Sequence, residues 1–188
     1  MNIFCDGTWN GPGSGTNVKR LHNILGGYYF AGPGTSKGTR LVGGIFGYGV
    51  ADIVTRVHTK FLLEYEDGPI NIFCYSRGGV AGRRFADDLA KEGHIITFLG
   101  VFDTVGSLGV PLGFWPFTIY DDYFMDHDIH PNILRAAHAI ALDEHSPVFV
   151  STPMNSREGI IEKGFAGDHG YVGRSDETLG WMLNQFAN

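Results

Sequence analysis

The chain has 188 residues, of which 43% are hydrophobic and 18% are charged, which is enough apolar material for one folded domain with an ordinary core. The formal net charge is −6 and no run of lysines or arginines occurs, which argues against nucleic acid as a partner, because that partner requires a basic face. The two cysteines, Cys5 and Cys74, each end an apolar run typical of a buried strand, so a disulfide framework is not expected.

The sequence also lacks the usual targeting signals. The first residues do not have the basic, apolar and small-residue order of a signal peptide, and no apolar run approaches the ~18 residues of a membrane span. We therefore expect a soluble, cytoplasmic protein, for which any export would follow a route without a signal peptide. We expect residues 1–188 to form a single domain.

Apolar runs and helical patterns alternate along the first 102 residues. Strands are expected at residues 1–5, 28–31, 70–74 and 95–102, and helices at residues 17–25, 50–65 and 78–91. Asn17 is expected to cap the first of these helices. The run at 95–102 is apolar throughout, as in a strand buried on both faces. This alternation predicts an α/β fold with a mostly parallel sheet and helices on both faces.

The next segment breaks the alternation. Residues 105–128 contain "GVPLGFWPFTIYDDYF", which is aromatic, interrupted by prolines and without a helical or alternating period. We expect a short aromatic cap over the sheet, with Phe114 and Trp115 against the substrate. The alternative is that these residues pack into the core or a subunit contact. Beyond it we expect a helix near 133–142, a strand at 159–167 and a last helix near 177–186.

The stretch "NIFCYSRGGVAGR" (residues 71–83) places Ser76 between a predicted strand and a predicted helix. The G-x-S-x-G pattern of hydrolytic enzymes holds its serine in a strained turn of this kind, although Cys74 replaces the first glycine here. Gly78 and the small Cys74 fit such a turn, and the Arg77 amide would face an oxyanion. Ser76 is therefore a candidate nucleophile; the alternative is an ordinary serine in a glycine-rich turn.

A serine nucleophile needs a base and an acid that orients the base. Asp103 follows the next predicted strand, and His169 lies in the glycine-flanked loop "FAGDHGYVG". The chain order Ser, Asp, His is the order found in hydrolases that use this strand-turn-helix serine. Each residue alone has a simpler explanation, Asp103 as a turn cap and His169 as a loop histidine, but their joint placement favours a catalytic triad.

The turn Asp6-Gly7-Thr8 follows the first predicted strand. If that strand is the neighbour of the strand before Ser76, the Gly7 or Thr8 amide would join the Arg77 amide in binding an oxyanion. Asp6 would then lie at the substrate. The alternative is a tight turn that Asp6 caps.

The remaining histidines have weaker patterns. His138 lies beside alanine and isoleucine on the predicted helix near 133–142, which favours a packed structural role. The segment "MDHDIH" (125–130) contains two histidines and two aspartates, but their spacing matches no familiar zinc motif, so no metal site is expected.

Several motifs together resemble one family. "FCDGTWN", "TNVKRL", "YSRGG", "GVFDTVGSLG" and "GFAGDHGYVG" followed by "DETLGWML" occur in the order seen in the α/β-hydrolase family of type VI secretion phospholipase effectors and their relatives. The resemblance covers nearly the whole chain. It implies an α/β-hydrolase-like fold with Ser76 as nucleophile, Asp103 as acid and His169 as base, and no cofactor. The family's histidine motif continues with Ser and Asp, where this chain has Gly170 and Tyr171.

We therefore expect a serine hydrolase of carboxylic esters, similar to an esterase, a lipase or a phospholipase A. Its expected partners are a small acyl ester or a phospholipid, with transient contact at a membrane surface. Two alternatives stay open: an esterase that acts on soluble or carbohydrate-borne acyl esters, and a binding module of the same fold that does not turn over substrate.

Overall fold

The computed structural model describes residues 1–35, 48–106, 128–145 and 151–188. Its described residues contain six strands: β1 (Asn2–Cys5), β2 (Tyr28–Phe30), β3 (Ile70–Tyr75), β4 (Ile96–Phe102), β5 (Ala136–Ala141) and β6 (Ile160–Phe165). All pair in parallel, in the order β2-β1-β3-β4-β5-β6. The predicted parallel sheet is confirmed, and β1 is the neighbour of β3.

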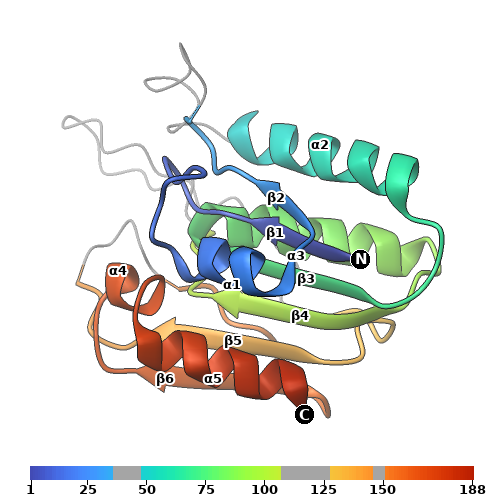
Figure 1. The fold of residues 1–188 in the computed structure, drawn as a ribbon. Coiled ribbons are helices and arrows are strands. Elements are labelled where there is room, and N and C mark those ends of the chain that lie inside the picture. The colour runs from blue at the N-terminus through green and yellow to red at the C-terminus, as the bar shows by residue number, and fades with distance from the viewer. Residues whose placement is uncertain (36–47, 107–127, 146–150) are drawn as a thin grey trace, which may run out of the picture.

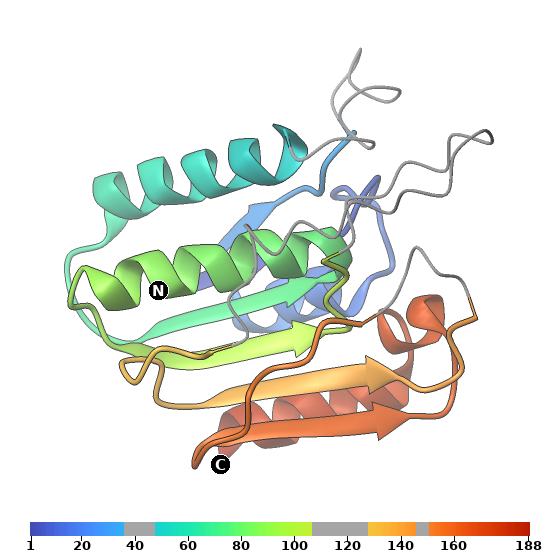
Figure 2. The ribbon, with the colours of Figure 1, turned by 180° about the vertical axis from the view of Figure 1, so that it is seen from behind.

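Helices cover both faces of the sheet (Figure 1; Figure 2). The helices are α1 (Asn17–Leu25), α2 (Tyr48–Glu64), α3 (Ser76–Lys91), α4 (His169–Val172) and α5 (Asp176–Ala187). Side chains alternate along β3, so that Ile72 and Cys74 pack with α2 and α3 while Phe73 and Tyr75 pack with α1 and α5. Both faces of the sheet are therefore buried, which explains the continuous apolar runs in its central strands.

The helix predicted near residues 133–142 is wrong, because this segment forms strand β5. Its alanines suit a helix by propensity, and a short apolar run does not by itself distinguish a helix from a buried strand. Here the small side chains of Ala137 and Ala139 pack in the same cluster as the α5 residues Leu179 and Met182. Close packing between the sheet and α5 therefore overrides helix propensity.

The cap of α1 also differs by one residue from the prediction. Thr16 is the N-cap and accepts a hydrogen bond from the Lys19 amide at 3.2 Å. The side chain of Asn17 instead donates to the Val172 and Ser175 carbonyls and to Thr178 Oγ1. Asn17 therefore ties α1 to the segment that follows His169.

Two further expectations from the sequence concern the aromatic cap and the absence of a membrane-spanning segment. Most of the predicted cap at 105–128, including Phe114 and Trp115, lies outside them. Within the described ranges, none of the helices has the length and apolar character that a membrane crossing requires.

Candidate active site

Ser76 lies at the junction of β3 and α3 in a strained backbone conformation. Its φ is +57°, in the left-handed region that residues with a side chain rarely adopt. Gly78 allows the tight turn, because a Cβ there would lie 2.3 Å from the Asp6 carbonyl oxygen and 2.5 Å from that of Cys5. The turn thus packs directly on the end of β1, and the strained geometry is that of a nucleophile elbow.

Cys74 is accommodated before the elbow by a glycine on the following helix. It packs against α3, where a Cβ on Gly82 would lie 2.9 Å from both Cβ and Sγ of Cys74. Its thiol lies 3.8 Å from the Gly79 carbonyl oxygen. Burial raises the pKa of Cys74 well above its ordinary value, so the thiol stays protonated. A glycine on the helix therefore makes room for the side chain on the strand.

Ser76, His169 and Asp103 form a continuous chain of hydrogen bonds. His169 Nε2 lies 2.9 Å from Ser76 Oγ, and His169 Nδ1 lies 2.6 Å from Asp103 Oδ2. An ionised carboxylate only accepts, so Nδ1 carries the proton and Nε2 accepts from the serine hydroxyl. Asp103 is fully buried, and Ser76 and His169 are only 6% and 8% exposed. The three residues predicted from the sequence are brought together with the geometry of a base between an acid and a nucleophile.

Asp103 and His169 are each held by neighbouring strands and loops. Asp103 follows β4 with a φ of +41°, and its Oδ1 accepts a hydrogen bond from the Ala141 amide at 3.1 Å. His169 is the first residue of α4, which Asp168 caps by accepting from the Tyr171 amide. The His169 amide donates to Glu144 Oε2 at 3.1 Å. The histidine is therefore part of a capped helical turn rather than of an open loop.

Tyr75 is a residue of the site that the sequence analysis missed. Its ring stacks on the His169 imidazole with centroids 4.8 Å apart, and its hydroxyl donates to the His169 carbonyl at 3.1 Å. A Cβ on Gly173 would lie 2.3 Å from Tyr75 Cζ, so that glycine leaves room for the ring. Tyr75, directly before Ser76 in the chain, thus orients the His169 imidazole. An aromatic residue at the end of a buried strand carries no sequence signal for such a role.

The turn after β1 lies against Ser76, as the place of β1 beside β3 predicts. A Cβ on Gly7 would lie 2.9 Å from Ser76 Cβ. The Gly7 amide donates to Asp6 Oδ1 at 2.8 Å, which removes Gly7 as an oxyanion donor. The Thr8 amide has no acceptor within the described residues. The Arg77 amide follows Ser76 at the N-terminus of α3, where the helix dipole is positive.

Asp6 does not have the substrate contact that the sequence analysis gave it. Its side chain is fully buried, and both carboxylate oxygens accept hydrogen bonds from within the chain. Oδ2 accepts from Thr16 and Tyr29 at 2.6 Å each and from Ser14 at 3.1 Å. Asp6 therefore organises the turn that carries Gly7 and Thr8.

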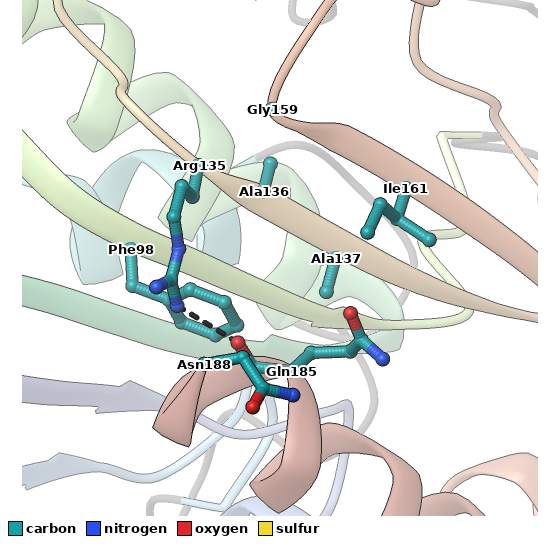
Figure 3. Close-up of a pocket in the computed structure, with 8 residues that line it drawn as sticks. All are labelled: Phe98, Arg135, Ala136, Ala137, Gly159, Ile161, Gln185 and Asn188. Atoms are coloured by element: carbon teal, nitrogen blue, oxygen red, sulfur yellow. Dashed lines mark hydrogen bonds between the residues drawn. The ribbon is translucent and has the colours of Figure 1, made fainter.

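A cavity of about 200 Å³ among the described residues lies away from this site (Figure 3). It is lined by residues near the amino ends of β4, β5 and β6 and by the end of α5, whereas Ser76 follows the carboxyl end of β3. Arg135 donates to the Gln185 and Phe186 carbonyls there, which ties the end of α5 to the sheet. This cavity is not the place where the triad would meet a substrate.

Comparison with models of protein families shows which family the chain belongs to. The model described as "T6SS, Phospholipase effector Tle1-like, catalytic domain" matches residues 81–186, more than half of the chain. The chain belongs to this family. The match includes Asp103 and His169 and begins just after Ser76. No curated protein matched the chain in a sequence comparison.

Solved structures share the fold at low sequence identity. An uncharacterized protein from Pseudomonas aeruginosa aligns with a TM-score of 0.61 and 18% identity, over 92% of this chain and 41% of its own. The Tle1 effector bound to the VgrG spike of the type VI secretion system aligns with a TM-score of 0.54 and 18% identity, over 92% and 50%. Mouse alpha/beta hydrolase domain-containing protein 10 aligns with a TM-score of 0.60 and 13% identity, over 99% and 87%. These likenesses confirm the α/β-hydrolase-like fold, and this member of the Tle1-like family spans half or less of the first two proteins.

Proposed function

We propose that the protein is a serine hydrolase that cleaves carboxylic esters through an acyl-enzyme. The observation that carries the proposal is the hydrogen-bonded chain from Asp103 Oδ2 through His169 to Ser76 Oγ, with distances of 2.6 and 2.9 Å. A hydroxyl becomes a strong nucleophile when a positioned base removes its proton, and these distances suit that transfer. Membership of a phospholipase effector family supports the same reaction class.

The chemistry follows from the geometry of these groups. His169 Nε2 takes the proton of Ser76 as Oγ attacks the acyl carbon, and Asp103 stabilises the imidazolium. The amides of Thr8 and Arg77 would stabilise the oxyanion. His169 then returns the proton to the departing alcohol, and a water molecule, activated in the same way, releases the acid and restores Ser76.

We propose glycerophospholipids at a membrane surface as the substrate class, with an acyl ester as the scissile bond. Family membership favours this class. The alternative of soluble or carbohydrate-borne acyl esters uses the same triad and differs only in the groups that bind the acyl chain and the alcohol. A binding module without turnover would need neither the strained φ of Ser76 nor the aligned imidazole, so the geometry favours an enzyme.

The test compares hydrolysis of short-chain and medium-chain nitrophenyl esters and of phosphatidylcholine vesicles by matched variants. Ser76→Ala and His169→Ala should each reduce kcat by roughly 10⁶-fold, since members of a triad act as a unit. Ser156→Ala, at an exposed serine, should leave kcat unchanged. Retained turnover in Ser76→Ala would refute the nucleophile, and activity on the soluble esters without any on vesicles would refute the phospholipid substrate.

A further inference from the structure

A second histidine lies next to the acid and has no part in the proposed reaction. His138 is in the middle of β5 and its side chain is fully buried. Its Nε2 accepts a hydrogen bond from the Thr104 amide at 3.2 Å, and its Nδ1 lies 2.8 Å from Glu162 Oε1 on β6. Hydrogen-bond partners on both ring nitrogens fix the orientation of a buried imidazole.

The Thr104 amide is important because it directly follows Asp103, the acid of the proposed triad. Asp103 has a left-handed φ of +41°, and such a residue persists only where the surrounding contacts determine both of its peptide groups. The Asp103 amide donates to the Ala139 carbonyl at 2.8 Å, and the next amide, that of Thr104, donates to the His138 ring. Strand β5 thus fixes the peptide on each side of the acid, one through its backbone and one through His138.

The protonation state of His138 follows from its partners. Nε2 must offer a lone pair to the Thr104 amide, so the proton lies on Nδ1 and is donated to Glu162. The same carboxylate oxygen of Glu162 accepts from the Met154 amide at 2.8 Å. Protonation of Nε2 would place two donors against each other and break the contact with Thr104.

Charged groups face His138 from three directions: Glu162 from β6, Arg83 from α3 and Asp103 from the turn after β4. Burial lowers the pKa of His138, and the hydrogen bond to Glu162 offsets this only in part. The Arg83 guanidinium donates hydrogen bonds to the Thr152 and Pro153 carbonyls, at 2.8 and 3.2 Å. The ring is therefore neutral near pH 7, as its contact with Thr104 requires.

We propose that His138 is a positioning residue for the reaction, which holds the Asp103-Thr104 turn so that the acid meets the base. This inference rests on the proposed function. The direct effect is geometric: without an acceptor, the Thr104 peptide can rotate and carry the Asp103 carboxylate away from His169 Nδ1. A displacement of about 1 Å in a catalytic group can cost roughly 10²-fold in rate.

The test compares two substitutions of similar size. His138→Gln keeps a side-chain oxygen that can accept from the Thr104 amide, and His138→Leu fills the space without an acceptor. We expect kcat on a soluble ester within about threefold of the parent for Gln and a fall of roughly 10-fold to 100-fold for Leu, with KM unchanged in both. Equal losses in both variants, in step with lowered melting temperatures, would show a purely structural role.

A second pair covers the case in which His138→Leu does not fold. Glu162 is partly exposed, so its variants should fold. Glu162→Ala frees Nδ1 and should lower kcat several-fold, whereas Glu162→Gln keeps an acceptor and should restore it. An unchanged kcat in Glu162→Ala would contradict the proposal.

One readout does not depend on turnover. The far-downfield proton resonance of the bond between His169 Nδ1 and Asp103 should persist in the parent and in His138→Gln, and weaken or vanish in His138→Leu and Glu162→Ala. If this pattern holds while no ester is cleaved, the positioning role stands and the proposed function fails. If esters are cleaved and the resonance is the same in all four proteins, the positioning role of His138 is contradicted and the proposed function is not.

Discussion

Cys74 shows how one residue can depart from a pattern without loss of the geometry that the pattern encodes. The position faces Gly82 on α3, and a side chain is accepted there because the helix has none. We predict that Gly82→Ala destabilises the protein, because its Cβ would lie 2.9 Å from Cys74, and that Cys74→Gly leaves activity within a few-fold. The double variant should recover part of the loss, with a coupling energy of about 0.5 to 3 kcal/mol from urea unfolding.

Strict additivity of the two single changes would contradict this packing account, and loss of all activity in Cys74→Gly would contradict the interpretation of the elbow. A thiol-blocking reagent gives an independent check. Burial raises the pKa of Cys74 well above its ordinary value and that of Cys5 to about 12, so both thiols should react slowly at pH 8 in the folded protein.

Asp6 is the residue whose contacts in the structure differ most from the role expected from the sequence. Its carboxylate accepts from the Gly7 amide and from three hydroxyls, so its effect on catalysis should pass through the turn beside Ser76. We predict that Asp6→Ala lowers kcat by roughly 10-fold to 100-fold, below the effect of losing an oxyanion donor outright, with little change in KM. Asp6→Asn keeps an oxygen for the Gly7 amide and should lose less.

Steady-state kinetics on one soluble ester separates the two roles of Asp6. A rise in KM at constant kcat would instead favour the substrate contact first expected from the sequence.

The sequence could supply the three residues of the proposed triad but not their surroundings. Chain order and strand ends identify Ser76, Asp103 and His169, because a parallel sheet brings its carboxyl ends to one edge. The bond between the Gly7 amide and Asp6 depends on a side-chain rotamer within one turn, and the stacking of Tyr75 on His169 depends on residues 94 positions apart. Neither contact produces a recognisable pattern in the local sequence.

At the scale of elements, most strands and helices could be predicted, and the assignment of a helix where a strand forms has a clear cause. The segment that forms β5 is alanine-rich and short, and only the sheet around it determines its conformation. That error hid the role of His138, because a helix would not have placed its ring beside the turn after β4. Elements with strong helical spacing, such as α2 and α3, could be predicted to within a few residues.

Two glycines, Gly173 at the C-cap of α4 and Gly180 in α5, should respond in opposite ways to alanine. At Gly173 a Cβ would strike Tyr75, whose ring orients His169, so Gly173→Ala should lower kcat by roughly 10-fold or more. At the exposed Gly180 of α5, nothing lies within 4 Å of an added Cβ, and Gly180→Ala should raise stability by about 0.5 to 1 kcal/mol at unchanged kcat. Unchanged kcat in Gly173→Ala would remove Tyr75 from the account of the site.

At the scale of the whole molecule, we propose that residues 1–188 unfold as one cooperative domain, since strands from both halves of the chain form one continuous sheet, joined where β3 pairs with β4. Its stability should depend on pH through His138. The pKa of His138 is lowered in the folded state by burial, so the unfolded chain binds more protons as pH falls below about 6.5. The free energy of unfolding should therefore decrease from pH 7 to pH 5.

Urea unfolding at several pH values measures this effect. One such group contributes a slope of at most about 1.4 kcal/mol per pH unit, and His138→Gln should flatten the curve by its share. If the free energy of unfolding varied with pH in the same way in the parent and in His138→Gln, His138 would not titrate differently in the folded and unfolded chains. Two separate unfolding transitions would contradict the single domain.

The central claim is that Ser76 is a nucleophile activated by His169 and Asp103. A fluorophosphonate reacts covalently with a serine that a base has activated, and peptide mapping by mass spectrometry then identifies the modified residue. We predict one adduct per chain, on Ser76, absent in Ser76→Ala and His169→Ala and retained in Ser156→Ala. A folded parent protein that takes no label, or that is labelled at another serine, would contradict the account.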